Sequence, residues 1–454
     1  MSPHVDILGA GQCGALLATM LAGRGFAVDV WERSPDPRAG GAPAGRSINL
    51  ALAARGINAL ERIGVLDRIR PLLVPMRGRM VHEVDGATEF LPYGQREGEQ
   101  IYSVSRGHLN RLLLDVAEDA GDVTLHFGQR VTGYDADRAV VTLHDVATGS
   151  DHEIAANPVF AADGAGSAVR HALDAARGIG ATEDLLPHGY KELTIPAGPG
   201  GEFRMEPNAL HIWPRGGFML IALPNPGGDF TLTLFLPNEG EPSFAELTDE
   251  AAAARFLERW FPDAVELIDE PAHALVANPL GLLGTVRCNR WHDGGNVLLI
   301  GDAAHAVVPF HGQGMNLAFE DCIVLERILD DTGPEWSEVF PAYERVQLKN
   351  ANAIADMALE NYVEMRDTVR DPRFALQKEL AFELERRLPG RFIPRYSMVM
   401  FHAEIPYSVA KKRGAVQSEL LDEFTRGAKT LADIDIDTAI EAVEQRLPPL
   451  NELR

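Results

Sequence analysis

Three glycines near the N-terminus, Gly9, Gly11 and Gly14, have the spacing GxGxxG. They follow the apolar run 5–8 and precede a segment of helical periodicity, so the pattern predicts a strand, a tight turn and a helix. Such a turn lets a pyrophosphate approach the backbone at the helix N-terminus. Glu32, which ends the next predicted strand, can accept hydrogen bonds from ribose hydroxyls and would repel a 2′-phosphate. The segment therefore predicts a dinucleotide site.

Two later apolar runs, which we also predict to be strands, end in a glycine and a carboxylate. Asp163–Gly164 follows the first run, and Gly301–Asp302 follows the second. Both turns resemble sequence motifs of the class A flavoprotein monooxygenases, the para-hydroxybenzoate hydroxylase group. A carboxylate at this edge of a sheet can bind ribityl hydroxyls, and the next helix N-terminus can stabilise negative charge on a flavin ring. The resemblance implies that the resident dinucleotide is FAD.

The resemblance also implies which residues hold the cofactor. Asp302 would contact the ribityl chain, Arg106 would reach the phosphates, and Asp163 would lie near the pyrophosphate and the path of a nicotinamide. Because the sequence has no second GxGxxG, NADPH would bind transiently on the same domain, as it does in this family. The cofactor-binding residues that we predict are Gly9, Gly11, Gly14, Glu32, Arg33, Arg106, Asp163, Gly164, Gly301, Asp302, Gly314, Met315 and Asn316.

Phe235 has an unexpected place in the predicted strand 230–236, FTLTLFL. The even positions of this strand form an apolar face, so Phe235 shares the opposite face with two threonines. In a strand with only a structural role, this ring would be a solvent-side aromatic residue. A ligand cavity on that face would explain the ring.

Longer segments between about residue 45 and residue 400 resemble the kynurenine 3-monooxygenase family. With the N-terminal glycine motif, the resemblance covers nearly the whole chain. It implies that NADPH reduces FAD, that O2 then gives a C4a-hydroperoxyflavin, and that one oxygen atom passes to the ring of L-kynurenine ortho to its aryl amine. The segments include GRSINLALAARG (45–56), MRGRMVH (76–82), PHGYKEL (187–193), GDAAHAVVPFHGQGMN (301–316) and ALENYVEM (358–365).

The same resemblance implies the substrate site. Arg79 would bind the α-carboxylate, which fits the preference of arginine for carboxylates. Tyr93, Asn361 and Tyr396 would be its companions at the amino-acid head, Met219 and Phe235 would contact the aromatic part, and Phe310 and His311 would lie in the catalytic region beside the flavin. Taken without the resemblance, Arg79 could be a surface salt-bridge residue, Asn361 and Tyr396 could make structural hydrogen bonds, and His311 could have a packing role. Only location supports a general-base role for His305 or His311.

Two other functions stay open at this point. A relative that acts on a substituted kynurenine or on another aryl amino acid would carry the same pocket residues. A flavin-fold binding protein without redox turnover, like the prenyl-GTPase escort proteins, would share the architecture, although three retained flavin motifs argue against it.

The composition excludes several classes of partner and site. The chain has 454 residues, with 66 acidic and 42 basic side chains and a formal net charge of −24, so we expect neither nucleic acid nor an anionic membrane as a partner. Cys13, Cys288 and Cys322 lack disulfide or zinc spacing, so we predict no metal and a reducing compartment. No secretory signal or long apolar run occurs, and charges interrupt the tail 431–454. We therefore expect a cytoplasmic monomer or homodimer without a membrane anchor.

The elements that must position these residues predict an α/β fold. It consists of a Rossmann-like FAD-binding domain with an inserted antiparallel β-sheet substrate domain and a helical C-terminal region. Local patterns predict helices at 50–63 and 109–120, a strand pair at 123–144, a sheet at 189–236 and mainly helices from 312 onward. The predicted domains are 1–72, 103–177 and 283–335 for FAD binding, 73–102 and 178–282 for the substrate, and 336–454 for the helical region.

Overall fold

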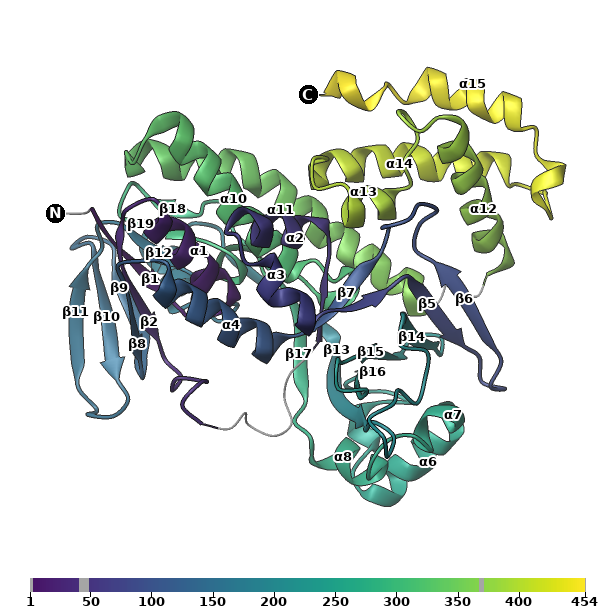
Figure 1. Cartoon of the computed structure of the whole chain (residues 1–454), viewed down its shortest axis with the longest axis horizontal. Helices are drawn as coiled ribbons and strands as arrows, with labels where there is room; N and C mark the ends of the chain where they lie inside the picture. The colour runs from purple at the N-terminus through teal and green to yellow at the C-terminus, as the bar shows by residue number, and fades with distance from the viewer. Residues whose placement is uncertain (1–2, 41–48, 367–370, 454) are drawn as a thin grey trace.

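Strands that lie far apart in the sequence form a six-stranded sheet in the computed structural model (Figure 1). The structure describes residues 3–40, 49–366 and 371–453, so the segment GRSI (45–48) lies outside the described residues. The sheet has the order β18-β19-β12-β1-β2-β8, and its strands run parallel except for β18, which is antiparallel to β19. The strands are β1 (His4–Leu8), β2 (Ala27–Glu32), β8 (Val123–Phe127), β12 (Val159–Ala161), β18 (His292–Asp293) and β19 (Val297–Leu299).

Helices cover this sheet because its central strands are apolar on both faces. Val5, Ile7 and Leu8 are all fully buried, as expected for a central parallel strand. Helix α1 (Gln12–Gly23) packs on the sheet and against both α4 (Arg106–Asp119) and α10 (Gly314–Thr332). The predicted mixed α/β fold is confirmed. The shorter helices of this region are α2 (Ala54–Arg62), α3 (Leu66–Ile69), α5 (Ala168–Arg177) and α9 (Asp302–His305).

Two local predictions in this region are wrong in part. The first residues of the predicted helix 50–63 belong to β3 (Asn49–Leu52), which pairs antiparallel with β7 (Ile101–Ser105), because this distant partner overrides the local helical pattern. The predicted strand pair 123–144 is three strands: β8 joins the large sheet, whereas β9 and β10 form a separate sheet. That sheet contains β9 (Gln129–Asp135), β10 (Val140–Asp145) and β11 (Asp151–Ala155). In the sheet of β3 and β7, the third strand is β4 (Val74–Met76), which pairs with the other edge of β7.

A seven-stranded sheet forms the second layer, in the order β17-β13-β16-β15-β14-β5-β6. On one face of this sheet, Phe230, Leu232 and Leu234 pack into an apolar core with α6, α7 and α8. On the other face, Met219 and Phe235 belong to the core that also contains the six-stranded sheet. The sheet follows the predicted substrate ranges closely, although β17 continues past residue 282, and the domain boundaries stay a prediction. Its elements are β5 (Gly78–His82), β6 (Thr88–Pro92), β13 (Thr182–Ile195), β14 (Ala209–Pro214), β15 (Met219–Pro224), β16 (Phe230–Pro237), β17 (Gly281–Arg287), α6 (Glu250–Trp260), α7 (Pro262–Val265) and α8 (Pro271–Ala277).

The C-terminal part of the chain is helical, as predicted, and lies above β5 and β6 in the view of Figure 1. It has a small apolar cluster of its own that includes Leu380, Phe392 and Leu420. The long helix α11 packs against both α10 and α14 and so joins this part to the rest of the protein. The helices are α11 (Trp336–Arg366), α12 (Pro372–Arg387), α13 (Arg395–Phe401), α14 (Tyr407–Phe424) and α15 (Ile436–Arg446).

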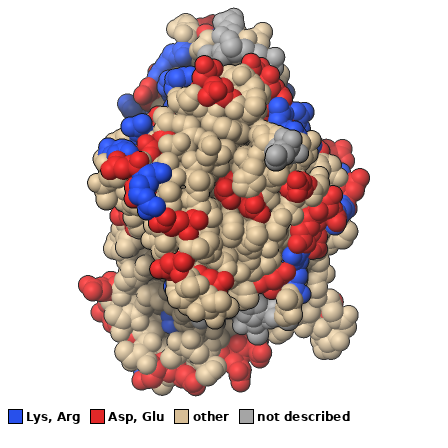
Figure 2. All heavy atoms as spheres, turned by 90° about the vertical axis from the view of Figure 1, so that its left-hand side faces the viewer, with Lys and Arg blue, Asp and Glu red and all other residues tan. Residues whose placement is uncertain are grey.

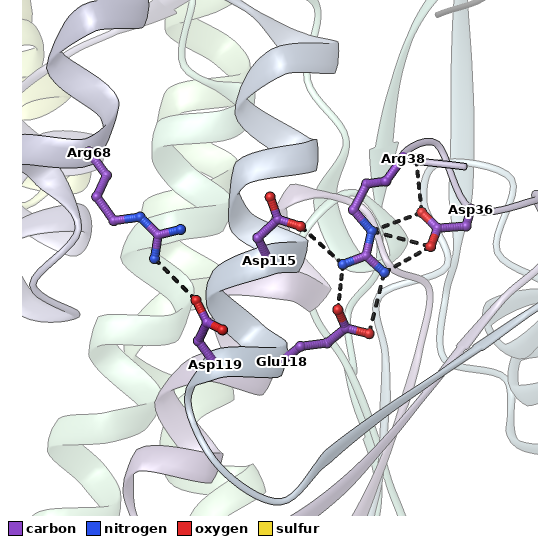
Figure 3. A network of polar contacts seen from close by, with 6 residues as sticks. All are labelled: Asp36, Arg38, Arg68, Asp115, Glu118 and Asp119. Carbon is purple, nitrogen blue, oxygen red and sulfur yellow. Dashed lines mark hydrogen bonds and ion pairs between the residues drawn. The ribbon is translucent and has the colours of Figure 1, made fainter. Parts of the chain in front are cut away.

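Ion pairs fix the chain that follows Glu32 against α4 (Figure 3). The guanidinium of Arg38 contacts the carboxylates of Asp36, Asp115 and Glu118, and the last two lie on α4. Asp115 and Glu118 lie in the C-terminal half of α4, so this network links the chain after β2 to that end of the helix. The carboxylates on α4 are about half exposed, so we assign the network a positioning role and little stability.

The surface agrees with the acidic composition. On the face shown in Figure 2, acidic side chains are spread among uncharged ones, and basic side chains gather in small groups near its edges. Within the described ranges, the structure has no helix that combines the length and the apolar character needed to cross a bilayer.

Arg55, on α2, ties the C-terminal helices to α10, and we predict that its loss destabilises the protein. Its buried guanidinium pairs with Glu320 at 3.1 Å, donates to the carbonyl of Val399 at 2.6 Å and to that of Ile405, and lies 3.8 Å from the ring centroid of Tyr407. Arg55→Met leaves the Glu320 carboxylate without its partner, so we expect the free energy of unfolding to fall by about 3–5 kcal/mol.

Thermal and urea unfolding would measure this effect. The matched control is Arg62→Met, because Arg62 lies two turns later on the same helix and its ion pair with Glu326 is half exposed. We expect that variant to unfold close to the wild type. Equal loss of stability in both variants would contradict the assigned role of Arg55.

Candidate active site

The glycine turn after β1 is closed by backbone packing that excludes side chains. A Cβ atom on Gly14 would lie 1.9 Å from the carbonyl oxygen of Gly9, and one on Gly9 would lie 2.4 Å from that of Ala162. Gly9 also has a φ of +102°, which favours glycine. A Cβ on Gly11, by contrast, would meet open space. The turn is therefore tight on its inner side and open where a ligand would approach.

The open side of this turn faces a cavity of about 630 Å³ and suits an anion. Gly11 caps α1 without a side-chain hydrogen bond, and the first turn of α1 has no acidic residue, so its N–H groups point at the cavity without a competing charge. These features fit the pyrophosphate of a dinucleotide. Predicted cofactor residues that line the cavity are Gly11, Arg106, Gly164, Asp302, Gly314 and Met315.

The remaining predicted cofactor residues are not among the described residues that line this cavity. The Glu32 carboxylate accepts hydrogen bonds from the backbone N–H groups of Ala10 at 2.9 Å and Ser34 at 2.8 Å, so it holds the glycine turn directly. Arg33 is exposed. Gly9, Gly14 and Gly301 shape the backbone turns and are absent from the lining of this cavity in the described structure.

Asp163 and Asn316 are engaged mainly with backbone. The Asp163 carboxylate accepts from the N–H of Ala168 at 2.9 Å, at the start of α5. The Asn316 amide donates to the carbonyls of Ala51 and Gly312, both at 2.8 Å, and accepts from the N–H of Ala53 at 2.9 Å. Their side chains fix the turns that border the cavity, and direct contact of either with a cofactor stays a prediction.

A buried carboxylate that sequence reasoning missed holds the Gly301–Asp302 turn. Asp321 is fully buried and accepts from the N–H of Gly301 at 3.1 Å, from His305 Nε2 at 2.7 Å and from Gln347 at 2.8 Å. Asp321, which lies on α10, thereby fixes Gly301, and the next residue, Asp302, lines the cavity. The sequence around Asp321 gives no signal for this role, because its partners come from two distant segments, 301–305 and the one that contains Gln347.

Arg79 also lines this cavity, beside two tyrosines. Its guanidinium carbon is 5.8 Å from the ring centroid of Tyr93 and 5.3 Å from that of Tyr396, and the two rings stack at 5.3 Å. Desolvation raises the pKa of both phenols, so each stays protonated and can donate a hydrogen bond. The three predicted residues form one cluster of donors, which suits a carboxylate.

An apolar wall connects this cluster to the glycine turn. Met219, Phe235, Phe310 and His311 all line the cavity, and Phe235 meets the Phe310 ring edge-on at 5.0 Å. Phe310 also stacks on Tyr362 at 3.8 Å, which fixes its plane. The face of β16 that carries Phe235 does border a cavity, as its place in the strand suggested.

Asn361 has a different environment from the other predicted head-group residues. Its amide donates to the carbonyl of Phe310 at 2.6 Å, and it lines a smaller neighbouring cavity of about 220 Å³. Arg79, Tyr93, His311 and Tyr396 border both cavities, so they form the partition between them. Asn361 therefore supports the Phe310 backbone, and a contact between Asn361 and the substrate stays a prediction.

His311 is a neutral imidazole in the folded protein. It is buried beside Tyr396, and burial lowers its pKa from 6.5 to about 3. Because the unfolded chain binds a proton near pH 6.5 and the folded protein does not, the contribution of His311 to stability is complete above this pH. It declines as the pH falls toward about 3, by about 5 kcal/mol at most.

We predict that His311→Gln makes the acid dependence of stability shallower. Urea unfolding of the wild type and the variant at several pH values between about 3 and 6.5 would measure the difference. The exposed His152, replaced in the same way, provides the control and should leave the slope unchanged. Parallel slopes for wild type and His311→Gln would show that His311 already binds a proton in the folded protein.

Comparisons with known proteins identify the family. The chain matches the FAD binding domain family over residues 3–355. Kynurenine 3-monooxygenase of Myxococcus xanthus is 47% identical over 445 residues, which cover 98% of this chain and 96% of that protein. The enzyme of the same name from Xanthomonas axonopodis pv. citri is 48% identical over 455 residues, which cover 99% of both.

Solved structures share the fold at lower identity. The tetrameric form of 2-methyl-3-hydroxypyridine-5-carboxylic acid oxygenase has a TM-score of 0.66 and 20% identity, and covers 82% of this chain and 94% of its own. Pseudomonas aeruginosa PqsL in complex with 2-aminobenzoylacetate has a TM-score of 0.64 and 24% identity, and covers 80% of this chain and 97% of its own. These comparisons, with the glycine turn and the cavity that it borders, show that the chain is an FAD-dependent flavoprotein monooxygenase of the kynurenine 3-monooxygenase family.

Proposed function

We propose that this protein hydroxylates L-kynurenine at the ring carbon ortho to its aryl amine. The reaction consumes O2, NADPH and a proton, and it yields 3-hydroxykynurenine, NADP⁺ and water. One oxygen atom enters the product and the other leaves as water, so the two electrons from NADPH balance the reaction.

The observation that carries this proposal is the arrangement along the larger cavity. A donor cluster of Arg79, Tyr93 and Tyr396 borders this space. His311, which stacks on Tyr396, connects the cluster to an apolar wall with Phe235 and Phe310, and the glycine turn borders the same space. An amino acid with an aromatic side chain matches this order of polar and apolar surfaces.

FAD, when bound, would supply the redox chemistry, which is the transfer of electrons from NADPH to O2. The residues that we assign to holding it are the glycine turn, Arg106, Gly164, Asp302 and the start of α10. Arg79 and the two tyrosines bind the α-carboxylate of the substrate and set the depth to which its ring enters. Met219, Phe235 and Phe310 orient the ring and exclude water, which protects the oxidant from unproductive decay.

The aryl amine activates its own ring, so the chain needs no nucleophile for this step. Neutral His311 borders the cavity and can donate or accept one hydrogen bond there. We assign it a positioning role beside the flavin and no general-base role.

Product analysis tests the proposal. The purified holoenzyme, incubated with L-kynurenine, NADPH and air, should form a product that is one oxygen atom heavier and that co-elutes with 3-hydroxykynurenine. Peroxide is measured in the same reaction, because NADPH oxidation with abundant peroxide and no hydroxylated product would contradict the assignment. A panel of ring-substituted kynurenines and other aryl amino acids, with NADH beside NADPH, would show whether a related substrate or the other nicotinamide is preferred.

A further inference from the structure

The proposed substrate is a zwitterion, and the donor cluster around Arg79 serves only half of its head group. Arg79, Tyr93 and Tyr396 offer N–H and O–H groups that suit the α-carboxylate. The α-ammonium needs an acceptor close to the same point, preferably a charged one. This inference rests on the proposed function, because it concerns how the same site recognises its substrate.

Glu364 provides a carboxylate next to Arg79, on the smaller-cavity side of the partition. Its Oε1 atom lies 3.6 Å from Nη1 of Arg79, and its side chain is 25% exposed beside the 10% exposed side chain of Arg79. It lines the smaller cavity with the four residues that form the partition between the two cavities. Glu364 is also one helical turn after Asn361 on α11, so both side chains lie on the same face of that helix.

The other charged groups around the smaller cavity already have partners. Lys378 donates to the carbonyl of Pro92 at 2.8 Å, and Arg395 is paired with Glu360. Among the described residues that line this cavity, Glu364 is the single carboxylate. Its distance to Arg79 is longer than a hydrogen bond, so the pair leaves carboxylate oxygens able to accept from a second cation.

We propose that Glu364 accepts a hydrogen bond from the α-ammonium of the amino-acid substrate while Arg79 binds its α-carboxylate. The two protein charges then mirror the two charges of the head group at the partition. Carboxylic acids without an α-amino group would use Arg79 alone, so Glu364 makes the site selective for α-amino acids over such acids.

A comparison of two ligands tests this role. The ligands are L-kynurenine and its analogue without the α-amino group, and the dissociation constants are obtained from the change in flavin absorbance when each ligand is added to the holoenzyme without NADPH. We expect Glu364→Gln to weaken L-kynurenine binding by about tenfold, the low end for a charge-assisted hydrogen bond because Glu364 is partly exposed. Binding of the analogue should stay unchanged, so the preference of the wild type for L-kynurenine disappears.

Two further variants support the comparison. Glu338→Gln removes one negative charge from the exposed start of the same helix and should leave both dissociation constants unchanged. Glu364→Asp keeps the charge and should retain part of the preference. FAD content and thermal unfolding show that each variant is folded.

The outcomes separate this inference from the proposed function. Equal weakening of both ligands in Glu364→Gln would mean that Glu364 only positions Arg79, and no weakening of either would mean that it has no role; both results overturn the inference. A wild-type protein that neither binds nor hydroxylates L-kynurenine would overturn the proposed function, and the inference with it.

Discussion

Arg79→Met is expected to keep its FAD and to lose about 100-fold in affinity for L-kynurenine, because the substrate carboxylate would lose its charge-assisted hydrogen bonds in a site largely closed to water. The guanidinium also lies against the rings of Tyr93 and Tyr396, so its removal loosens the donor cluster as well. Because the variant no longer binds L-kynurenine well, the substrate should no longer stimulate NADPH oxidation. Titration of flavin absorbance and stopped-flow measurement of NADPH oxidation would record both effects.

Arg77→Met is the matched control for this variant. Arg77 lies two residues earlier and is exposed, so we expect wild-type affinity and stimulation. If Arg79→Met bound L-kynurenine as tightly as the wild type, the assignment of the donor cluster to the substrate site would be wrong.

Gly14→Ala is expected to give protein that is purified with little or no FAD. The added Cβ would lie 1.9 Å from the Gly9 carbonyl oxygen, and backbone at that distance must move. The movement would displace the start of α1 from β1 and misdirect the N–H groups that face the cavity, so we expect FAD affinity to fall by about 100-fold or more. The ratio of flavin to protein absorbance and titration with added FAD would measure the loss.

Gly23→Ala tests whether this effect is specific to the turn. Gly23 ends the same helix, is exposed, and would place a Cβ in open space. We expect normal FAD content in this variant, with equal or slightly higher stability because alanine favours a helix. Full flavin content in Gly14→Ala would contradict the close approach on which this prediction depends.

Much of the flavin region could be predicted from the sequence because its signals are local. The glycine turn, its strand and its helix are contiguous, and the strand alternation around Phe235 showed that one side chain lay on the wrong face for a structural strand. Each of these features depends on residues that lie in the same element or in the next one along the chain. The β-pairing of Asn49–Leu52 was missed because its partner lies about 50 residues later.

The parts of the site that sequence reasoning missed depend on distant contacts. Asp321 is one acidic residue in a helix until the fold brings Gly301, His305 and Gln347 around it. Glu364 did have a local signal, its spacing of three from Asn361, but without the position of Arg79 this spacing does not distinguish a site from a solvated helix face. Such roles are set by tertiary packing, which a single sequence does not contain.

The strand order of the six-stranded sheet has a consequence for how the protein is made. β1 lies between β2 and β12, and β12 in turn needs β19, so the sheet gains its last members only when residues near Val297 are available. A ribosome-bound chain would hold an incomplete sheet with an open strand edge for most of its synthesis, a state that exposes apolar surface and favours aggregation. A ready supply of chaperones should therefore raise the yield of active enzyme, and N-terminal fragments that stop before β19 should be insoluble.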